Sequence, residues 1–524
     1  MTTAEPAEHT PSDARASRLN LGQRIAPLLI VIAYLALLVI VVRTRTYAAT
    51  NHDVAWLIIC AERWLHGAVL GVDLMEINLP GAMLLYVPPV WLADATGLPQ
   101  TTCVDLWVGI VAVLGAALVA RIVSLLDGRV PFSRQEFLTG LLLAPGFALL
   151  PGLDFAQRDQ FVAILLLPYA ILTMAGSRWR DGAFLRHVTA VLAALAICIK
   201  PHYVVLLVGG FLVQTYREGW RRALLQTDAF LIAAIGLGYI ALVLTVFAPW
   251  VDMARSMSPL YLSFGGEFGA ILVAAILPAL LFCAGLCLAN LQLAGGTTLR
   301  NLLVYAGLAL VLFVVQGKGW EYHALPIHLF LWAGVIVIFI ANLPAIAARS
   351  KFPALLGLML VVVPVLLTEW AWRLGMYDRI RYEQFVEDVG IRQFAHPGDA
   401  VQFLTLTQSL PFPMVLHEKY VWALRYPALW PLGGIFSRAG QKTDVTEPAN
   451  RAAIALVATQ IAEDIARYRP RVIVVDDREN QPYLPTSFHF LPLLREVAAF
   501  DAAWQDYTRA SETAAYQIYV RKGP

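Results

Sequence analysis

The feature that most constrains this chain is a series of long apolar runs separated by short polar segments. A helix needs about 20 predominantly apolar residues to cross the hydrocarbon core of a bilayer. Hydrophobic residues make up 59% of the 524 and charged residues only 15%, which excludes an ordinary soluble protein. We therefore predict a polytopic α-helical membrane protein. The long runs are 25–42, 103–125, 228–249, 269–292, 323–341 and 353–372, and shorter runs in close pairs are 136–150, 157–176, 187–199, 203–216 and 300–316.

The orientation of the spans depends on one further apolar run, 79–97, which is interrupted by prolines. If this run does not cross, fifteen Lys and Arg residues fall on the cytoplasmic side and seven in the short outer loops. If it crosses, the basic segments 121–134, 178–186 and 217–222 all lie outside. Because cytoplasmic loops carry an excess of Lys and Arg, we predict about 11 spans, a cytoplasmic N-terminus and an external C-terminus. The run 79–97 then lies in or dips into the outer leaflet as a broken helix.

Composition divides the chain into three parts. Residues 1–24 are polar and predict a disordered cytoplasmic tail, whereas 25–372 hold the spans, with 43–102 as the first outer loop. Residues 373–524 alternate strand-like and helix-like segments, which predicts an α/β domain outside the membrane. The expected strands are 400–406, 471–476 and 515–521, and an expected helix is 450–468.

Polar residues gather in the predicted outer loops, each at the end of an apolar run. Ionisable side chains at the membrane edge are costly and usually functional. We therefore predict one site built from four separate loops. Its candidate residues are Asp53 and Glu76 in the first loop, Asp154, Arg158 and Asp159 in the second, Lys200 and His202 in the third, and Lys318, Trp320, Tyr322 and His323 in the fourth.

This combination of side chains suits an anionic lipid-linked ligand. Arg158, Lys200, His202 and Lys318 are candidates to bind a phosphate, and a nearby carboxylate can take a proton. Transfer of a sugar from a polyprenyl phosphate needs a base for the acceptor hydroxyl and cations that stabilise the departing phosphate. Asp53 is the candidate base, and Trp56, Trp320, Tyr322 and His323 are candidates to contact the sugar or prenyl groups.

The segment 51–93, "NHDVAWLIICAERWLHGAVLGVDLMEINLPGAMLLYVPPVWLA", resembles the first outer loop of GT-C membrane glycosyltransferases. That superfamily includes protein O-mannosyltransferases, lipid A aminoarabinose transferases and galacturonosyltransferases of lipopolysaccharide. The resemblance implies that Asp53 is the catalytic carboxylate and that a second acidic position falls on Asp159 or Asp154. It also matches Lys200-Pro201 to a turn common in the group. The chain departs from the pattern before its proline pair, where relatives often carry a basic residue or His.

Several of these residues have a structural alternative. Asp53 stands at the start of a predicted helix, where an aspartate commonly caps the backbone. Arg158 could instead form a local ion pair with Asp154 or Asp159. Lys200 could extend from the end of a span toward the membrane surface. The same applies to the other outer-loop residues: His202 and His323 as interfacial histidines, and Trp320 and Tyr322 as aromatic-belt residues.

The reading that the residues and the resemblance favour is an inverting glycosyltransferase of a bacterial inner membrane. It would move a sugar from a polyprenyl-phosphate donor to an envelope glycan, lipid or protein on the periplasmic face. No metal-binding acidic pair is evident and many GT-C members need none, although a divalent cation stays open as a cofactor. No basic tract indicates nucleic acid. The alternative is a transporter or flippase of a lipid-linked or anionic solute, which the one-sided clustering of charges and the lack of an inverted repeat disfavour.

Overall fold

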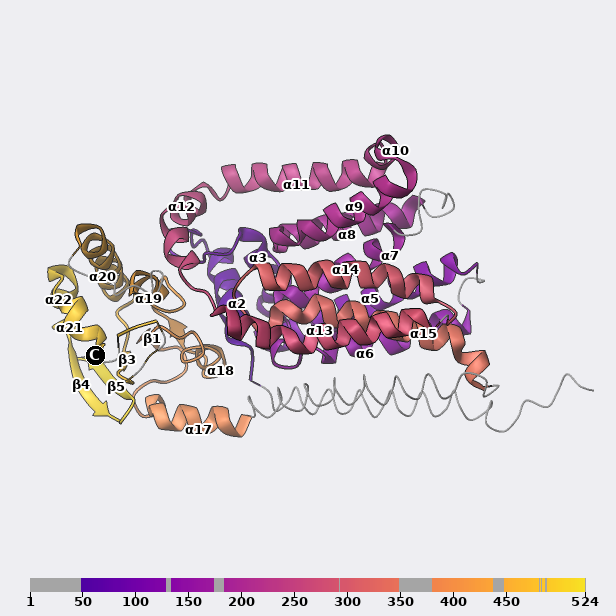
Figure 1. The fold of residues 1–524 in the computed structure, drawn as a ribbon. Helices are drawn as coiled ribbons and strands as arrows, with labels where there is room; N and C mark the ends of the chain where they lie inside the picture. Colours follow the sequence, from indigo (N-terminus) through magenta and orange to yellow (C-terminus); the bar gives the residue numbers. More distant parts are fainter. Residues whose placement is uncertain are drawn as a thin grey trace, which may run out of the picture.

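The chain folds into a bundle of long helices with a sheet-containing part beyond one end of it (Figure 1). The computed structural model describes residues 49–128, 133–173, 183–291, 293–347, 379–436, 447–479, 481, 483–485 and 488–523. The predicted spans 25–42 and 353–372 and the predicted tail 1–24 lie outside these residues.

Every apolar run that falls within the described residues forms a helix. Five segments there are long and apolar enough to cross a membrane: Gln100–Leu126 (α5), Thr227–Thr245 (α11), Phe268–Asn290 (α13), Gly296–Val315 (α14) and Glu321–Pro344, which holds most of α15 (Leu325–Ala347). The sequence groups 300–316 with the shorter runs, but α14 begins earlier and reaches the length of a span. The remaining helices of this part are α6 (Arg134–Leu149), α7 (Arg158–Thr173), α8 (Ala183–Ile199), α9 (Val204–Glu218), α10 (Trp220–Leu224) and α12 (Ala248–Leu262).

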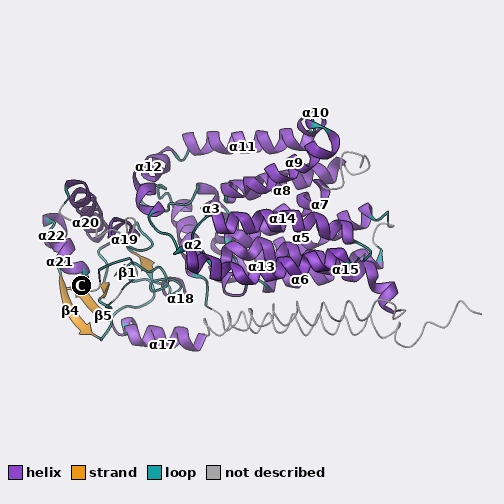
Figure 2. Ribbon diagram, in the orientation of Figure 1, coloured by secondary structure: helices purple, strands orange, loops and turns teal. Residues whose placement is uncertain are grey.

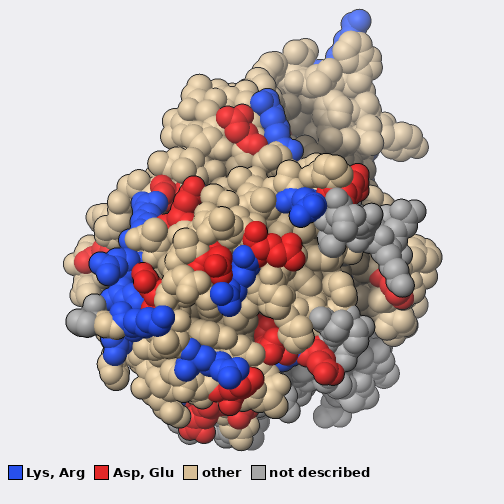
Figure 3. All heavy atoms as spheres, turned by 90° about the vertical axis from the view of Figure 1, so that its left-hand side faces the viewer, with Lys and Arg blue, Asp and Glu red and all other residues tan. Residues whose placement is uncertain are grey.

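The surfaces of the two parts differ in chemistry. Large apolar side chains on α11 and α13, such as Leu237 and Val273, are more than half exposed, which suits contact with lipid. Over the end of the molecule that carries the sheet, acidic and basic side chains are interspersed (Figure 3). The helical bundle is therefore the membrane part. The short helix α10, with Arg221 and Arg222, lies at the end of the bundle away from the sheet (Figure 1). Which end faces which compartment stays a prediction.

The described residues of segment 43–102, the predicted first outer loop, form three helices, α2 (His52–Leu65), α3 (Pro80–Leu84) and α4 (Val87–Thr96). The predicted break in 79–97 is confirmed, because α3 ends before Leu85 and α4 begins at Val87. Pro88 lies in the first turn of α4, where backbone N–H groups have no partner within the helix. A Cβ at Gly81 would lie 2.1 Å from the Cys198 carbonyl oxygen, so glycine lets α3 pack against the end of α8.

The C-terminal part is a five-stranded sheet flanked by helices (Figure 2). Its strands stand in the order β2-β1-β3-β5-β4; β1 is parallel to β2 and β3, and β5 is antiparallel to β3 and β4. All of β3 is buried, as is typical of a central strand covered on both faces. The strands are β1 (Ala400–Leu404), β2 (Val421–Trp422), β3 (Val472–Asp476), β4 (Tyr507–Glu512) and β5 (Tyr516–Arg521), so the three predicted strands form β1, β3 and β5. The helices are α17 (Arg379–Val389), α18 (Met414–His417), α19 (Trp430–Phe436), α20 (Pro448–Tyr468), α21 (Phe490–Arg495) and α22 (Ala498–Trp504).

The predicted first outer loop and the C-terminal part share one hydrophobic core. A single cluster of buried apolar residues includes α2, α3, α12 and the strands β1 and β3, whereas a second cluster fills the bundle. The backbone N–H of Met75 donates to the Arg425 carbonyl at 2.8 Å, and Arg467 pairs with Asp73. A Cβ at Gly434 would lie 2.5 Å from the Leu260 carbonyl, so α19 approaches α12 at backbone distance. The C-terminal part is thereby held against the first loop.

Candidate active site

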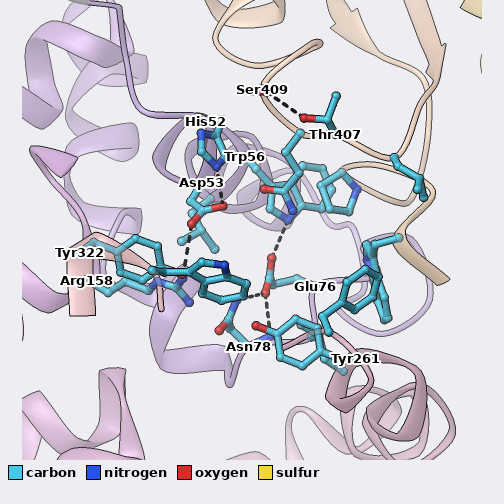
Figure 4. A pocket seen from close by; sticks show the side chains of 18 of the residues that line it. His52, Asp53, Trp56, Glu76, Asn78, Arg158, Tyr261, Tyr322, Thr407 and Ser409 are labelled. Atoms are coloured by element: carbon cyan, nitrogen blue, oxygen red, sulfur yellow. Dashed lines mark hydrogen bonds and ion pairs between the residues drawn. The ribbon is translucent and has the colours of Figure 1, made fainter. Parts of the chain in front are cut away.

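A cavity of about 540 Å³ lies where the helical part meets the C-terminal part (Figure 4). The volume falls in the usual range of small-molecule sites. Loops far apart in the sequence line it: the start of α2, the segment 75–78, the start of α7, the segment 319–322 and three loops of the C-terminal part. The predicted site residues that line it are Asp53, Trp56, Glu76, Arg158, Trp320 and Tyr322. Those that do not are Asp154, Asp159, Lys200, His202, Lys318 and His323.

The N-cap of α2 is Asn51, so the capping alternative for Asp53 is wrong. The Asn51 side-chain oxygen accepts hydrogen bonds from the backbone N–H groups of Asp53 at 3.0 Å and Val54 at 3.5 Å. The same oxygen accepts from the Gln157 amide at 3.0 Å. Because Asn51 satisfies the helix end, the Asp53 carboxylate is left to face the cavity.

Asp53 lies among three polar neighbours. Its Oδ2 accepts a hydrogen bond from Gln157 Nε2 at 3.0 Å and lies 4.0 Å from Nη2 of Arg158, while its Oδ1 lies 3.6 Å from His52 Nε2. Burial opposes ionisation of Asp53, but the charges of His52 and Arg158 and the hydrogen bond from Gln157 outweigh it and lower its pKa below the usual value. The carboxylate is therefore ionised at neutral pH, and 20% of its side chain stays exposed.

Arg158 has spare hydrogen-bonding capacity. The residue is 3% exposed, and its Nε and Nη1 have no hydrogen-bond partner among the described residues. The nearest carboxylate oxygen of Asp53 lies 4.0 Å from Arg158 Nη2, which is a long distance for an ion pair. A guanidinium offers a planar fork of donors that matches phosphate or carboxylate oxygens. Arg158 therefore lines the cavity with two donors that no described residue satisfies.

Glu76 lines the cavity with both carboxylate oxygens engaged. Its Oε2 accepts from Trp56 Nε1 at 2.5 Å, and its Oε1 accepts from the backbone and side-chain N–H groups of Asn78 at 2.6 and 2.5 Å. Burial raises the pKa of Glu76 although Arg158 and these hydrogen bonds oppose the shift. Trp250 Nε1 also donates to the Glu76 carbonyl at 2.9 Å. Glu76 thus fixes Trp56 and the 75–78 segment in the cavity wall.

Asp159 and Lys200 form a closed pair behind the cavity. Lys200 Nζ donates to Asp159 Oδ2 at 2.6 Å, and Tyr203 donates to Oδ1 at 2.6 Å. The ammonium also packs 4.9 Å from the ring centre of Tyr322, which itself lines the cavity. Lys200 therefore meets Asp159 and Tyr322, not the cavity. Within the part of the chain that the structure describes, the ion-pair partner of Arg158 is Asp53, and Asp159 pairs with Lys200.

The other predicted residues support the walls. Asp154 accepts a hydrogen bond from Asn51 Nδ2 at 3.4 Å and so links the second loop to the start of α2. Lys318 donates to the Phe264 and Tyr261 carbonyls and packs 5.5 Å from the Trp320 ring centre; burial lowers its pKa. His202 and His323 lie with ring centres 6.4 Å apart outside the cavity lining.

Sequence reasoning missed several lining residues. His52 and Asn78 flank predicted positions, and no local pattern sets them apart. The clearest missed signal is "TLTQS" (405–409), which directly follows strand β1. Ligands of open α/β sheets bind at the carboxyl ends of parallel strands, and this polar loop stands at such an end. Across the residues that the structure describes, no group of three or more His, Cys, Asp or Glu side chains is placed to hold a metal.

The structure resembles that of ArnT from Cupriavidus metallidurans bound to undecaprenyl phosphate, with a TM-score of 0.55 over 95% of this chain and 98% of that one. The sequences are 14% identical. This chain shares the fold of ArnT. At this identity the match shows the fold, which agrees with the fold implied by the resemblance of segment 51–93. Apo ArnT aligns with a TM-score of 0.48 at 13% identity over 94% of this chain and 98% of that one. No protein-family model and no characterised protein matches the sequence.

Proposed function

We propose that this protein is an inverting glycosyltransferase of a bacterial inner membrane, which moves a sugar from a polyprenyl-phosphate donor to an envelope acceptor on the periplasmic face. The observation that carries the proposal is the ionised Asp53 beside the unused donors of buried Arg158 in an aromatic-lined cavity. The ArnT fold supports it, because the similar ArnT structure holds undecaprenyl phosphate. The residues that line the cavity include the start of α2 and the start of α7, at the end of the helical bundle next to the sheet, where a prenyl chain in the bilayer would deliver its phosphate.

The chemistry divides between the two charged residues. Asp53 accepts the proton of the acceptor hydroxyl as its oxygen attacks the anomeric carbon of the sugar. The bond from that carbon to the phosphate oxygen breaks, and its electron pair leaves with the phosphate. Nε and Nη1 of Arg158 stabilise the negative charge that grows there. Attack opposite the leaving phosphate inverts the anomeric centre.

The remaining lining residues position the reactants. Trp56, Trp320 and Tyr322 offer flat faces for a sugar ring or the first prenyl unit. The hydrogen bond from Gln157 keeps Asp53 directed toward Arg158. Because Arg158 supplies the positive charge at the phosphate, the proposal needs no divalent cation, and transfer is expected to survive EDTA.

The decisive experiment compares envelope glycolipids by mass spectrometry in cells that lack this protein. The cells are restored with the wild type or with Asp53→Asn at matched membrane levels. We expect a sugar mass to disappear from one envelope component and to return only with the wild type. A flippase moves a lipid-linked sugar across the membrane without breaking its bond to the phosphate. Sugar transfer catalysed by the purified wild-type protein would therefore exclude that alternative. Full restoration by Asp53→Asn would contradict the catalytic role of Asp53.

A further inference from the structure

The C-terminal part presents the binding edge of its sheet to the cavity. Strands β2, β1 and β3 are parallel, and the loops that follow all three line the cavity. Thr407 and its neighbours follow β1, Trp430 follows β2 and Tyr483 follows β3. Carboxyl ends of parallel strands are where open α/β sheets bind ligands. A domain that only shielded the membrane site would not need to turn this edge toward it.

The wall that this edge contributes carries no Asp, Glu, Lys, Arg or His among the described lining residues. It consists of Leu406, Thr407, Gln408, Ser409, Pro427, Trp430 and Tyr483, apart from the Tyr483 phenol all without a titratable group. The ionisable His, Asp, Glu and Arg side chains that line the cavity come from the helical part. Figure 4 shows Thr407 and Ser409 reaching the cavity from the C-terminal ribbon, opposite the helical part that carries Arg158. The two walls thus suit different ends of one ligand.

Within this wall, the loop after β1 offers neutral hydrogen-bonding groups. Thr407 Oγ1 and Ser409 Oγ lie 2.8 Å apart, and each hydroxyl keeps capacity for another partner. The Oε1 atom of Gln408 is buried and accepts no hydrogen bond from any residue the structure describes. A buried carbonyl oxygen without a donor is costly, and a ligand hydroxyl would satisfy it.

The loop is also held in place before any ligand arrives. The backbone N–H of Thr407 donates to Thr405 Oγ1 at 3.2 Å, and Thr405 in turn donates to Asp476 Oδ2 at 2.8 Å. Arg478 donates to both oxygens of buried Asp476 at 2.8 and 2.7 Å. This chain of contacts joins the ends of β1 and β3, so the polar groups of the loop are preorganised.

We propose that Thr407, Gln408 and Ser409 recognise the hydroxyl groups of the donor sugar and thereby select an uncharged sugar. The inference rests on the proposed function and adds the sugar class to it. With the phosphate at Arg158 and the anomeric carbon near Asp53, the far side of the sugar meets the C-terminal wall. An ammonium or carboxylate on that side would lose water without meeting an opposite charge. Hydroxyl groups would instead pair with the loop.

The test uses the purified full-length protein in nanodiscs with three synthetic donors. These are undecaprenyl phosphate linked to a neutral hexose, to an aminopentose or to a hexuronic acid, and plain undecaprenyl phosphate is the binding reference. Donor affinity is measured directly, and transfer is measured with envelope extract from cells lacking the protein. The variants are Thr407→Val and Gln408→Met, and the matched control is Thr459→Val, whose hydroxyl bonds within α20.

We expect the wild type to prefer the neutral donor, and each loop variant to lower its kcat/KM roughly 10- to 100-fold. Affinity for plain undecaprenyl phosphate should stay unchanged in every variant, and Thr459→Val should behave as the wild type. A wild-type preference for a charged sugar, unchanged donor selection in the loop variants, or a loss confined to acceptor KM would each overturn the inference. If the wild type transfers no donor, the proposed function fails and this inference fails with it. If the wild type transfers a sugar and Asp53→Asn does not, the proposed function stands, and the results with the loop variants alone decide this inference.

Discussion

Arg158 and Asp159 are consecutive residues of α7, but their ion pairs differ: the pair of Arg158 lines the cavity, whereas the pair of Asp159 is buried behind it. Consecutive residues of a helix point about 100° apart, so one reaches the cavity and the other reaches the protein interior. Arg158 faces Asp53 across 4.0 Å in the cavity and keeps two unpaired nitrogens. Asp159 meets Lys200 at 2.6 Å and also accepts from Tyr203, with no exposed surface of its own. The first pair is open to a ligand, and the second is complete.

The difference separates catalysis from stability. A buried pair with full hydrogen bonding loses much when one partner is removed, because the other charge stays buried without compensation. An ion pair with unpaired donors and an exposed carboxylate oxygen can use these groups to bind a substrate. We therefore expect changes in the open pair to affect transfer, and changes in the closed pair to affect folding.

The largest expected effect is that of Asp53→Asn, which should lower kcat roughly 10²- to 10⁴-fold because the base is removed. The amide keeps an oxygen for Gln157, so thermal unfolding should shift little. Transfer kinetics and thermal unfolding in detergent measure both. Asp154→Asn is the control, since Asp154 is buried nearby but does not line the cavity. An equal loss of rate in the control would argue that the open pair has no special role.

Lys200→Met should destabilise the protein by about 3–5 kcal/mol, because Asp159 is left charged and buried. Thermal and denaturant unfolding of the detergent-solubilised protein measure the loss. The double variant Lys200→Met/Asp159→Asn removes both charges and keeps an acceptor for Tyr203. We expect it to recover most of the stability and most of the transfer rate. Stable folding of Lys200→Met with abolished transfer would show that Lys200 acts on the substrate.

Arg158→Gln should lower kcat roughly 10²- to 10³-fold through lost stabilisation of the leaving phosphate. Arg158→Lys keeps the charge without the planar fork and should recover only part of the rate. Affinity for undecaprenyl phosphate, measured by titration, should weaken in both variants. Arg121→Gln, which breaks a pair with Glu136 on another helix, is the control and should leave that affinity unchanged.

Asn51→Ala should cost about 1 kcal/mol of stability, the usual value of an N-cap. Asn51 also accepts from Gln157, so the variant tests whether the cap holds the open pair together. We expect a modest decrease in kcat with an unchanged KM for the donor. A decrease as large as that of Asp53→Asn would show that Asn51 does more than orient Asp53.

The smallest expected effect is that of mild acid on the transfer rate. The pKa of Asp53 is lowered, so its carboxylate is lost only as the pH falls through a value below the usual 3.8. The kcat/KM of the wild type should therefore stay nearly flat from about pH 7 to about pH 5. A pH–rate profile measures this. An acid limb in that window would contradict the assignment of Asp53 as the base.

The membrane class and most helices could be predicted from local patterns. Apolar runs of span length form helices wherever residues are described, and the proline pair marks the break between α3 and α4. The strands β1, β3 and β5 follow from short apolar runs bounded by polar residues. These features depend on a residue and its near neighbours, so they can be read along the chain.

The candidate site was only half predictable. Polar residues at the ends of apolar runs named Asp53, Glu76 and Arg158, which do line the cavity. Lys200 was expected beside them because it shares their end of the bundle, but its partner is Asp159. Which face of a helix meets a cavity depends on packing against distant segments, and a residue adjacent to a site residue can point away from it.

The sequence by itself determined a helical membrane protein with polar loops gathered at one end, because hydrophobic length and charge placement act locally. Only the tertiary structure decided which charged side chains line the cavity, such as Arg158, and which are paired inside the protein, such as Lys200. It also showed that the strand edge carrying Thr407 and Gln408 closes the cavity over Asp53, more than 350 residues away. Contacts across that sequence separation arise from a shared core between α2 and the sheet, and no local pattern encodes them.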